Sequence, residues 1–328
     1  MGKQTVRYKY NRIAIALAVT LLLFLSLVSA CSAEEKKPAP APAAKTEPSE
    51  PEVKEEPTIA PFKAEGLEKN IKYFNVRNNY QLETGDLILV NAACRYRGQP
   101  AELVGNYSYL FNDENKRIGS TSSTMNRGCK RMLEAFNDML CAFYDKTKLT
   151  TIMLADIYLN EAEQKNCYEH DTGLAFDLRL YLESEKSFPL FTGEGEYGWF
   201  AQNCHNYGFI LRYPDNKQQY TGVSYRPEHF RFVGRPHSQI IHDKAMCLEE
   251  YLDYIKSYTL ETPLSYRDRS GNCWAVYYYE QKIGEDSTNI PIPLDSSDAE
   301  YPYTISGDNR NGFIIAVDLT PKKTDTDK

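Results

Sequence analysis

The sequence lacks several features that would point directly to a type of site. No Cys-x-x-Cys pair occurs among its eight cysteines, which argues against a zinc site made of thiolates. There is no excess of positive charge, since the net charge is −7, so we expect no nucleic-acid partner. Histidine occurs only five times, and a lone histidine is more often structural than a metal ligand. A metal site must therefore be argued from a specific combination of residues.

The first 31 residues have the pattern of a bacterial lipoprotein signal peptide. A basic start precedes an apolar run, Ile13 to Val28, whose 16 residues are few for a membrane span. The run ends in "LVSAC", and cleavage there would leave Cys31 as a lipidated N-terminus. The alternative is an uncleaved anchor with an incidental cysteine. We expect a lipoprotein held through Cys31 at the outer face of the bacterial cytoplasmic membrane.

The segment 32–61 predicts a disordered tether. It holds seven prolines and many Glu, Lys and Ala residues, and it has too little apolar surface to offset its chain entropy. About 260 residues then remain before a polar tail at 321–328, enough for one large domain or for a domain with an appendage. An odd number of cysteines follows Cys31, and no pairing can be assigned; Cys141 and Cys247 are expected on buried helix faces.

Hydrophobic patterning predicts an α+β core at 62–259 and a β-rich appendage at 260–320, with no internal repeat. Apolar residues at helical spacing indicate an amphipathic helix over 129–143. Short apolar runs between turn residues indicate strands. The complete prediction places helices at 129–143, 197–207 (closed by Gly208) and 238–258, and strands at 86–90, 149–157, 174–182, 209–213, 228–233, 274–280, 289–294 and 312–319.

Three residues could meet around a metal: His170 and Asp177 in "YEHDTGLAFD", and His229 in "YRPEHFRFVG". The first two flank Gly173, where a turn followed by a strand can bring both side chains to one point. A catalytic zinc site needs three nitrogen or oxygen ligands and an open position. The spacing alone is weak evidence, because each histidine could equally be structural.

The stretch "EHDTGLAFD" closely resembles the S-x-H-x-x-G-x-A-x-D signature of zinc D,D-carboxypeptidases and dipeptidases of the vancomycin-resistance type, the LAS metallopeptidases. A later stretch, "NYGFILRYPDNKQQYTGVSYRPEHFRFVG", is similar to the second half of those enzymes. The resemblance implies a small, mostly antiparallel sheet flanked by helices, a Zn²⁺ cofactor held by His170, Asp177 and His229, and a peptidoglycan stem peptide ending in D-Ala-D-Ala as substrate. We expect a monomer.

The sequence departs from this family at three positions. The catalytic Glu of the E-x-x-H motif is replaced by Arg226, and the nearest carboxylate is Glu228, beside the third ligand. Leu159 stands at the position of the family's substrate-polarising arginine, and Tyr168 stands where the family has serine. An arginine is always protonated and cannot act as a base. Glu228 is therefore the candidate base. In an extended segment, however, its side chain and that of the neighbouring ligand His229 would point to opposite sides.

Other polar residues have weaker claims to a role in the site. Arg231 and His237, with Tyr168, are candidates for contact with a ligand residue or with substrate, although His237 could instead cap the following helix. Glu169 and Asp171 are alternative bases, but both are expected to be loop carboxylates. Two hypotheses follow: an active zinc carboxypeptidase with a rearranged base, or a catalytically impaired relative that binds zinc and cell-wall peptide without hydrolysis. A weaker third reading is a scaffold whose β-rich tail recruits a partner.

Overall fold

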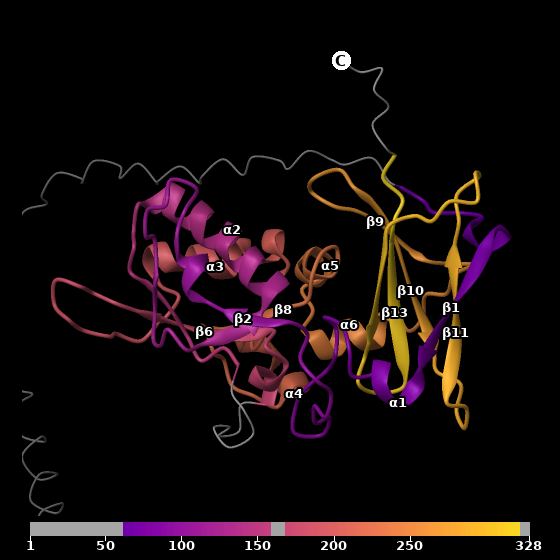
Figure 1. Ribbon diagram of the computed structural model, residues 1–328, viewed down its shortest axis with the longest axis horizontal. Helices are drawn as coiled ribbons and strands as arrows, with labels where there is room; N and C mark the ends of the chain where they lie inside the picture. Colours follow the sequence, from indigo (N-terminus) through magenta and orange to yellow (C-terminus); the bar gives the residue numbers. More distant parts are fainter. Residues whose placement is uncertain (1–61, 159–167, 322–328) are drawn as a thin grey trace, which may run out of the picture. The chain divides into compact units, whose positions relative to one another are not determined.

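The computed structural model describes residues 62–158 and 168–321, coloured along the chain in Figure 1. The predicted signal peptide with Cys31, the tether and Leu159 lie outside the described residues. No helix in the described part of the chain is long and apolar enough to span a membrane.

A five-stranded sheet forms the centre of the core and confirms the predicted α+β class. Its strand order is β3-β5-β6-β8-β7, and every neighbouring pair is antiparallel except β3 with β5. The predicted strands at 149–157, 174–182, 209–213 and 228–233 are all present in shorter form. The strands span Ser120–Thr121 (β3), Ile152–Ala155 (β5), Ala175–Leu180 (β6), Phe209–Leu211 (β7) and His229–Phe232 (β8).

The helix α2, Lys130–Thr147, buries its apolar stripe against this sheet, as its spacing predicts. The rings of Phe136 in α2 and Phe176 in β6 pack edge to face with centroids 5.0 Å apart. Lys148 ends the helix in a left-handed conformation (φ 60°). The predicted second helix is also present, as α3 (Gly198–Asn203) followed by a 3-10 turn, η5 (Cys204–Tyr207). Gly208 closes it at φ 85°, which favours glycine.

The predicted strand at 86–90 is wrong: the segment is buried but pairs with no strand. Its backbone groups bond elsewhere. The Asp86 and Ile88 carbonyls accept from the Arg231 guanidinium, and Leu87 N–H donates to Ser306 Oγ. An apolar run therefore marks burial here, while side chains and the Asp308 carbonyl supply the partners that a neighbouring strand would otherwise provide.

The single helix predicted at 238–258 is also wrong, because two helices occupy this region. They are α5, His237–Asp243, and α6, Leu248–Ile255. Ala245 between them adopts φ 49°, which a helix cannot contain. A capping box then begins α6, in which the Cys247 N–H donates to the Glu250 carboxylate at 2.8 Å. The apolar spacing continues across the break and conceals it in the sequence.

The C-terminal residues form a four-stranded antiparallel sheet, ordered β12-β13-β10-β9, which contains two of the predicted strands. A further pair joins β1 near the start of the described chain to β11 near its end, a pairing that the sequence did not indicate. Figure 1 shows both groups of strands. The strands span Ile71–Arg77 (β1), Leu264–Arg267 (β9), Cys273–Glu280 (β10), Ser287–Pro293 (β11), Tyr303–Gly307 (β12) and Gly312–Asp318 (β13).

The C-terminal sheet shares a hydrophobic cluster with the core. Tyr251 and Leu252 of α6 belong to the same buried cluster as Val276 of β10 and Ile314 of β13. The division at residue 260 remains a prediction. The smaller elements of the described chain are α1 (Asn78–Gln81), α4 (Gln218–Thr221), β2 (Leu103–Gly105), β4 (Arg127–Cys129), and 3-10 turns at 67–69 (η1), 107–110 (η2), 195–197 (η4) and 215–217 (η6).

The described cysteines form no disulfide. Cys247 is buried, as predicted, whereas Cys141 is half-buried. The others in the described residues are Cys94, Cys129, Cys204 and Cys273, all free thiols.

Candidate metal centre

Two of the three predicted ligands are placed by the register of the central sheet. The strands β6 and β8 are antiparallel, and Asp177 lies directly opposite His229. Directly opposed residues on one face of a sheet have their side chains within contact distance. The distance between Asp177 Oδ1 and His229 Nδ1 is 2.6 Å. Strand pairing therefore joins residues that are 52 positions apart in the chain.

The third residue, His170, comes from a 3-10 turn, η3 (Tyr168–Thr172), just before β6. Gly173 ends the turn at φ 65° and has its N–H bonded to the His170 carbonyl. The His170 ring is fixed by a bond of 2.7 Å between Nδ1 and the Ile157 carbonyl. The Nδ1 nitrogen is thereby the protonated one, because a carbonyl can only accept. Nε2 is left with its lone pair 3.7 Å from Asp177 Oδ1.

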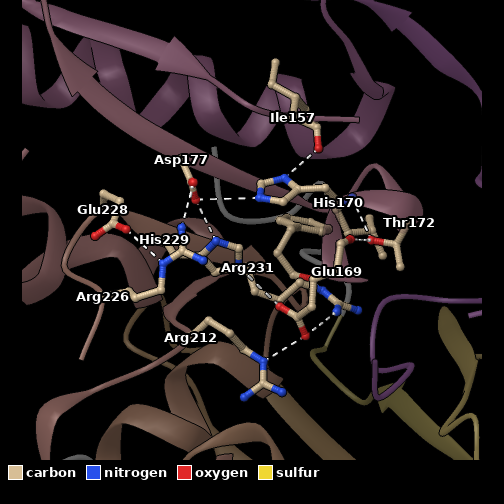
Figure 2. Close-up of polar contacts among 12 residues, drawn as sticks. Ile157, Glu169, His170, Thr172, Asp177, Arg212, Arg226, Glu228, His229 and Arg231 are labelled. Atoms are coloured by element: carbon tan, nitrogen blue, oxygen red, sulfur yellow. Dashed lines mark hydrogen bonds and ion pairs between the residues drawn. The ribbon is translucent and has the colours of Figure 1, made fainter. Parts of the chain in front are cut away.

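The donor atoms of His170, Asp177 and His229 all lie within 4.8 Å of one another, and all three residues are buried (Figure 2). His170 Nε2 has no hydrogen-bond partner among the described residues. A buried lone pair without a partner is costly in a protein interior. Two imidazole nitrogens and one carboxylate are also donors that zinc accepts. The residues present therefore fit a zinc ion held by three protein ligands.

Asp177 and His229 shift each other's pKa. Burial alone would raise the pKa of Asp177, but the hydrogen bond and charge of His229, with His170 and Arg226, lower it below its ordinary value. Burial alone would lower the pKa of His229, but its hydrogen bond to Asp177 and the nearby carboxylate of Glu169 raise it instead. The histidine therefore holds its proton firmly, and a metal ion binding at Nδ1 must displace that proton.

Glu169 is the residue whose place the sequence did not reveal. It was expected to be a loop carboxylate, but it is fully buried beneath His229. Its Oε1 accepts from Arg212 Nε at 2.8 Å and from Arg231 Nη1 at 3.1 Å, and its Oε2 lies 3.5 Å from His229 Nε2. Burial would raise the pKa of Glu169, but the two guanidinium groups outweigh burial and hold it well below its usual range. It is a permanent anion behind the triad.

The buried arginines continue this network away from the triad. Arg212 binds Glu249 of α6 through two parallel bonds of 2.8 and 2.7 Å, a geometry that fixes both groups. Arg231, a candidate for contact with substrate, is fully buried and bonds the backbone of 86–88 and Glu169. Its guanidinium therefore holds the fold around the triad together.

Arg226 lies against the triad but is neutralised there. It donates to Asp177 Oδ2 at 2.8 Å and to Glu228 Oε1 at 2.8 Å. Figure 2 shows its guanidinium between these two carboxylates. Arg226 and Glu228 are two positions apart, on either side of Pro227, and residues 227–228 form a turn just before β8. The arginine occupies the outer oxygen of Asp177 and leaves Oδ1 facing the two histidines.

Other predicted candidates lie elsewhere or are only partly described. His237 begins α5, is buried, and binds the Tyr251 hydroxyl at 2.6 Å; burial lowers its pKa to about 3. Tyr168 begins η3, but its side chain lies outside the described part. Two further histidines, His205 and His242, stack on each other with ring centroids 3.6 Å apart, and His205 is buried.

Comparison with known proteins agrees with this geometry. Residues 159–235 match the model of VanY, D-alanyl-D-alanine carboxypeptidase. This stretch of the chain is therefore similar to the VanY D-alanyl-D-alanine carboxypeptidase family. All three triad residues lie inside the matched VanY region.

Several curated proteins are similar to this part of the chain. A D-alanyl-D-alanine carboxypeptidase of Enterococcus faecium is 38% identical over 149 residues, covering 45% of this chain and 43% of the relative. A bifunctional D-Ala-D-Ala dipeptidase and carboxypeptidase, VanXYC of Enterococcus gallinarum, is 48% identical over 91 residues, 27% of this chain and 48% of the relative. The chain thus spans less than half the length of these curated relatives.

The fold of the core has a solved counterpart. The vancomycin-resistance D,D-dipeptidase VanXYg, solved in complex with a D-Ala-D-Ala phosphinate analogue, superposes with a TM-score of 0.61 at 25% identity. The match covers 76% of this chain and 99% of VanXYg. The predicted fold class is therefore confirmed, with the C-terminal antiparallel sheet as an addition to it.

The metal assignment predicts a specific loss. In His170→Ala, zinc should no longer bind at one per chain, because only two ligands remain. The measurement is zinc content after dialysis, by atomic absorption. His242→Ala is the matched control, since His242 is half-exposed on α5 and lies outside the triad. Retention of one zinc per chain in His170→Ala would show that the ligand set is wrong.

Proposed function

We propose that this protein is an envelope-anchored, zinc-dependent D,D-carboxypeptidase-like protein that acts on the D-Ala-D-Ala ends of peptidoglycan stem peptides. The observation that carries the proposal is the buried His170, Asp177 and His229 triad within the region that matches the VanY family. The proposed anchor is lipid on Cys31, at the outer face of the cytoplasmic membrane. The sequence pattern around that cysteine supports the location.

A cleft of about 460 Å³ opens beside the triad and is the proposed place for the peptide end. Its wall includes Asp177 and, on the turn before β8, Arg226 and Glu228. Leu190 and Tyr225 line it too, and both expose much of their side chains. The exposed apolar side chains and the charged side chains of this cleft together suit a short peptide with small apolar side chains and a terminal carboxylate.

When bound, zinc would polarise the scissile carbonyl and lower the pKa of a water molecule. The protein must then provide a group that accepts the water's proton. Glu228 lines the same cleft as Asp177, so it is the proposed base. Glu169 is a poor alternative, because it is buried away from the cleft and both guanidinium partners bind its Oε1.

A second function is favoured by the position of Arg226. Its guanidinium lies between Glu228 and Asp177 and bonds both, so the proposed base begins in an ion pair. A chain whose base cannot leave that ion pair would bind zinc and the wall peptide without cutting it. This binding protein is the alternative that the assay must distinguish.

The assay uses the full chain, loaded with zinc, and a muropeptide ending in D-Ala-D-Ala. We expect release of D-alanine, followed by mass spectrometry, and a loss of rate of about 10²-fold or more in Glu228→Gln, the usual contribution of a positioned base. Glu134→Gln is the control, because Glu134 is an exposed carboxylate of α2.

Each outcome has a clear meaning for the two functions. Release that survives Glu228→Gln would place the base elsewhere. No release from a chain that holds one zinc and retains the muropeptide on a binding column would overturn the hydrolase and support the binding protein.

A further inference from the structure

The inner side of His229 faces a carboxylate that the proposed reaction does not use. His229 Nε2 and Glu169 Oε2 are both buried and lie 3.5 Å apart, and neither atom has a hydrogen-bond partner among the described residues. The opposite nitrogen of the same ring, Nδ1, faces Asp177 and the triad. One imidazole therefore joins the candidate metal centre to a buried anion (Figure 2).

We propose that Glu169 is a positioning residue that fixes His229 as a metal ligand through Nδ1, and that Glu249 of α6 supports Glu169 through Arg212. The proposal rests on the proposed zinc site and goes beyond it, because neither carboxylate reaches the donor atoms of the triad. Its consequence is that α6 contributes to metal affinity without touching the metal.

The first step concerns the tautomer of His229. A neutral imidazole carries a hydrogen on only one of its two nitrogens. The nitrogen that binds a metal must be the one without the hydrogen. If Nδ1 is the ligand, Nε2 carries the hydrogen and needs an acceptor in a place that water does not reach. Glu169 Oε2 is the acceptor in position. A carboxylate behind a metal-bound histidine sets the ring's orientation and makes it a stronger donor.

The second step concerns what holds Glu169. Its other oxygen is held by Arg212 and Arg231, so the carboxylate cannot rotate away from His229 without breaking two charged bonds. Arg212 is in turn held by the paired bonds to Glu249. Three fully or almost fully buried charged groups thus run from the ring of His229 to α6.

The third step concerns α6 itself. Glu249 precedes Tyr251 and Leu252, which pack in the cluster shared with the C-terminal sheet. The helix is therefore fixed by apolar packing, and Glu249 is a stationary anchor for Arg212. By linkage, a support that raises metal affinity is itself stabilised when the metal binds.

The test measures zinc affinity of the full chain by competition with a chromophoric chelator. Glu169→Gln should weaken binding about 10- to 100-fold, the usual effect of losing such a carboxylate. Glu249→Gln should weaken it by a smaller factor, above about threefold, because it acts through Arg212. Glu250→Gln is the matched control: it is the next residue of α6, and its carboxylate binds Lys217 and the Cys247 N–H.

A second readout separates positioning from mere support of the fold. Nitrogen-15 NMR of the zinc-loaded wild type should show His229 protonated at Nε2, and Glu169→Gln should shift that nitrogen's signal. Variants that melt at lower temperature yet bind zinc with unchanged affinity would overturn the proposal. If Glu169→Gln does not fold, Glu249→Gln decides by the same affinity criterion.

Failure of this inference can be told from failure of the proposed function. A wild type that binds no zinc would overturn both. Affinity losses in the two variants, with no D-alanine released by the wild type, would support Glu169 as a positioning residue and reject the hydrolase alone.

Discussion

Replacing Arg226 by glutamate is expected to raise the rate of D-alanine release about 10²-fold, the lower end of what a well-placed base contributes. The substitution removes the guanidinium that bonds Glu228 and Asp177 and puts a carboxylate at the position of the E-x-x-H motif. Zinc at the triad would compensate the added negative charge, because a cation between anions stabilises both.

The measurement is kcat/KM for the muropeptide, compared with Arg226→Gln. Glutamine removes the positive charge without adding a base, so an increase in kcat/KM in both variants would mean that releasing Glu228 from its ion pair is enough. An increase in Arg226→Glu alone would mean that the new carboxylate at position 226 acts as the base. No gain in either variant, with zinc still bound, would show that Arg226 is not what limits the reaction.

Replacing Arg212 by leucine is expected to lower the free energy of unfolding by about 3–5 kcal/mol, the usual cost of removing one partner from buried charge pairs. Arg212 has no exposed surface, and it bonds Glu169 on one side and Glu249 on the other. Without it, two carboxylates face each other in the interior with less compensation. Both must then take up protons, or the region must open to water.

Urea unfolding of the zinc-free chain at neutral pH would measure this change. Lys256→Met is the control, because the Lys256–Asp253 pair is largely exposed and such pairs contribute at most about 1 kcal/mol. If Arg212→Leu lowered the free energy of unfolding no more than the control does, Arg212 would not be needed to compensate the buried carboxylates of this network.

The triad could be predicted because the stretches around His170, Asp177 and His229 resemble a known family; the spacing of the three residues alone was weak evidence. The central strands are predictable from local information, because short apolar runs become buried strands, as Leu154, Phe176 and Phe230 show.

Glu169 could not be predicted in this way. Its partners Arg212 and Arg231 are 43 and 62 positions away, and nothing next to Glu169 in the sequence shows that they converge on it. The residue looks like a loop carboxylate because it is next to His170 in a turn. Its burial becomes apparent only once Arg212, just after β7, and Arg231 in β8 place both guanidinium groups beneath the triad.

The failed predictions share a different physical cause. At 86–90 the apolar run reports burial correctly, but apolarity does not say which groups take the backbone hydrogen bonds. At 238–258 the apolar residues keep helical spacing across a break made by Ala245 and the capping box of Cys247 and Glu250. Hydrophobic periodicity thus shows which face of a helix or strand is buried, but it does not show where a helix is interrupted.

The pairing of β1 with β11 has a consequence for how the chain reaches its folded state. Asn75 and Ser287 meet across this ladder although 212 positions separate them. Contacts of such high sequence separation form slowly, because a long loop must close first. Until β11 has emerged, β1 is an unpaired edge that carries the exposed rings of Tyr73 and Phe74. A chaperone that covers this strand during synthesis would protect the nascent protein from aggregation until β11 pairs with it.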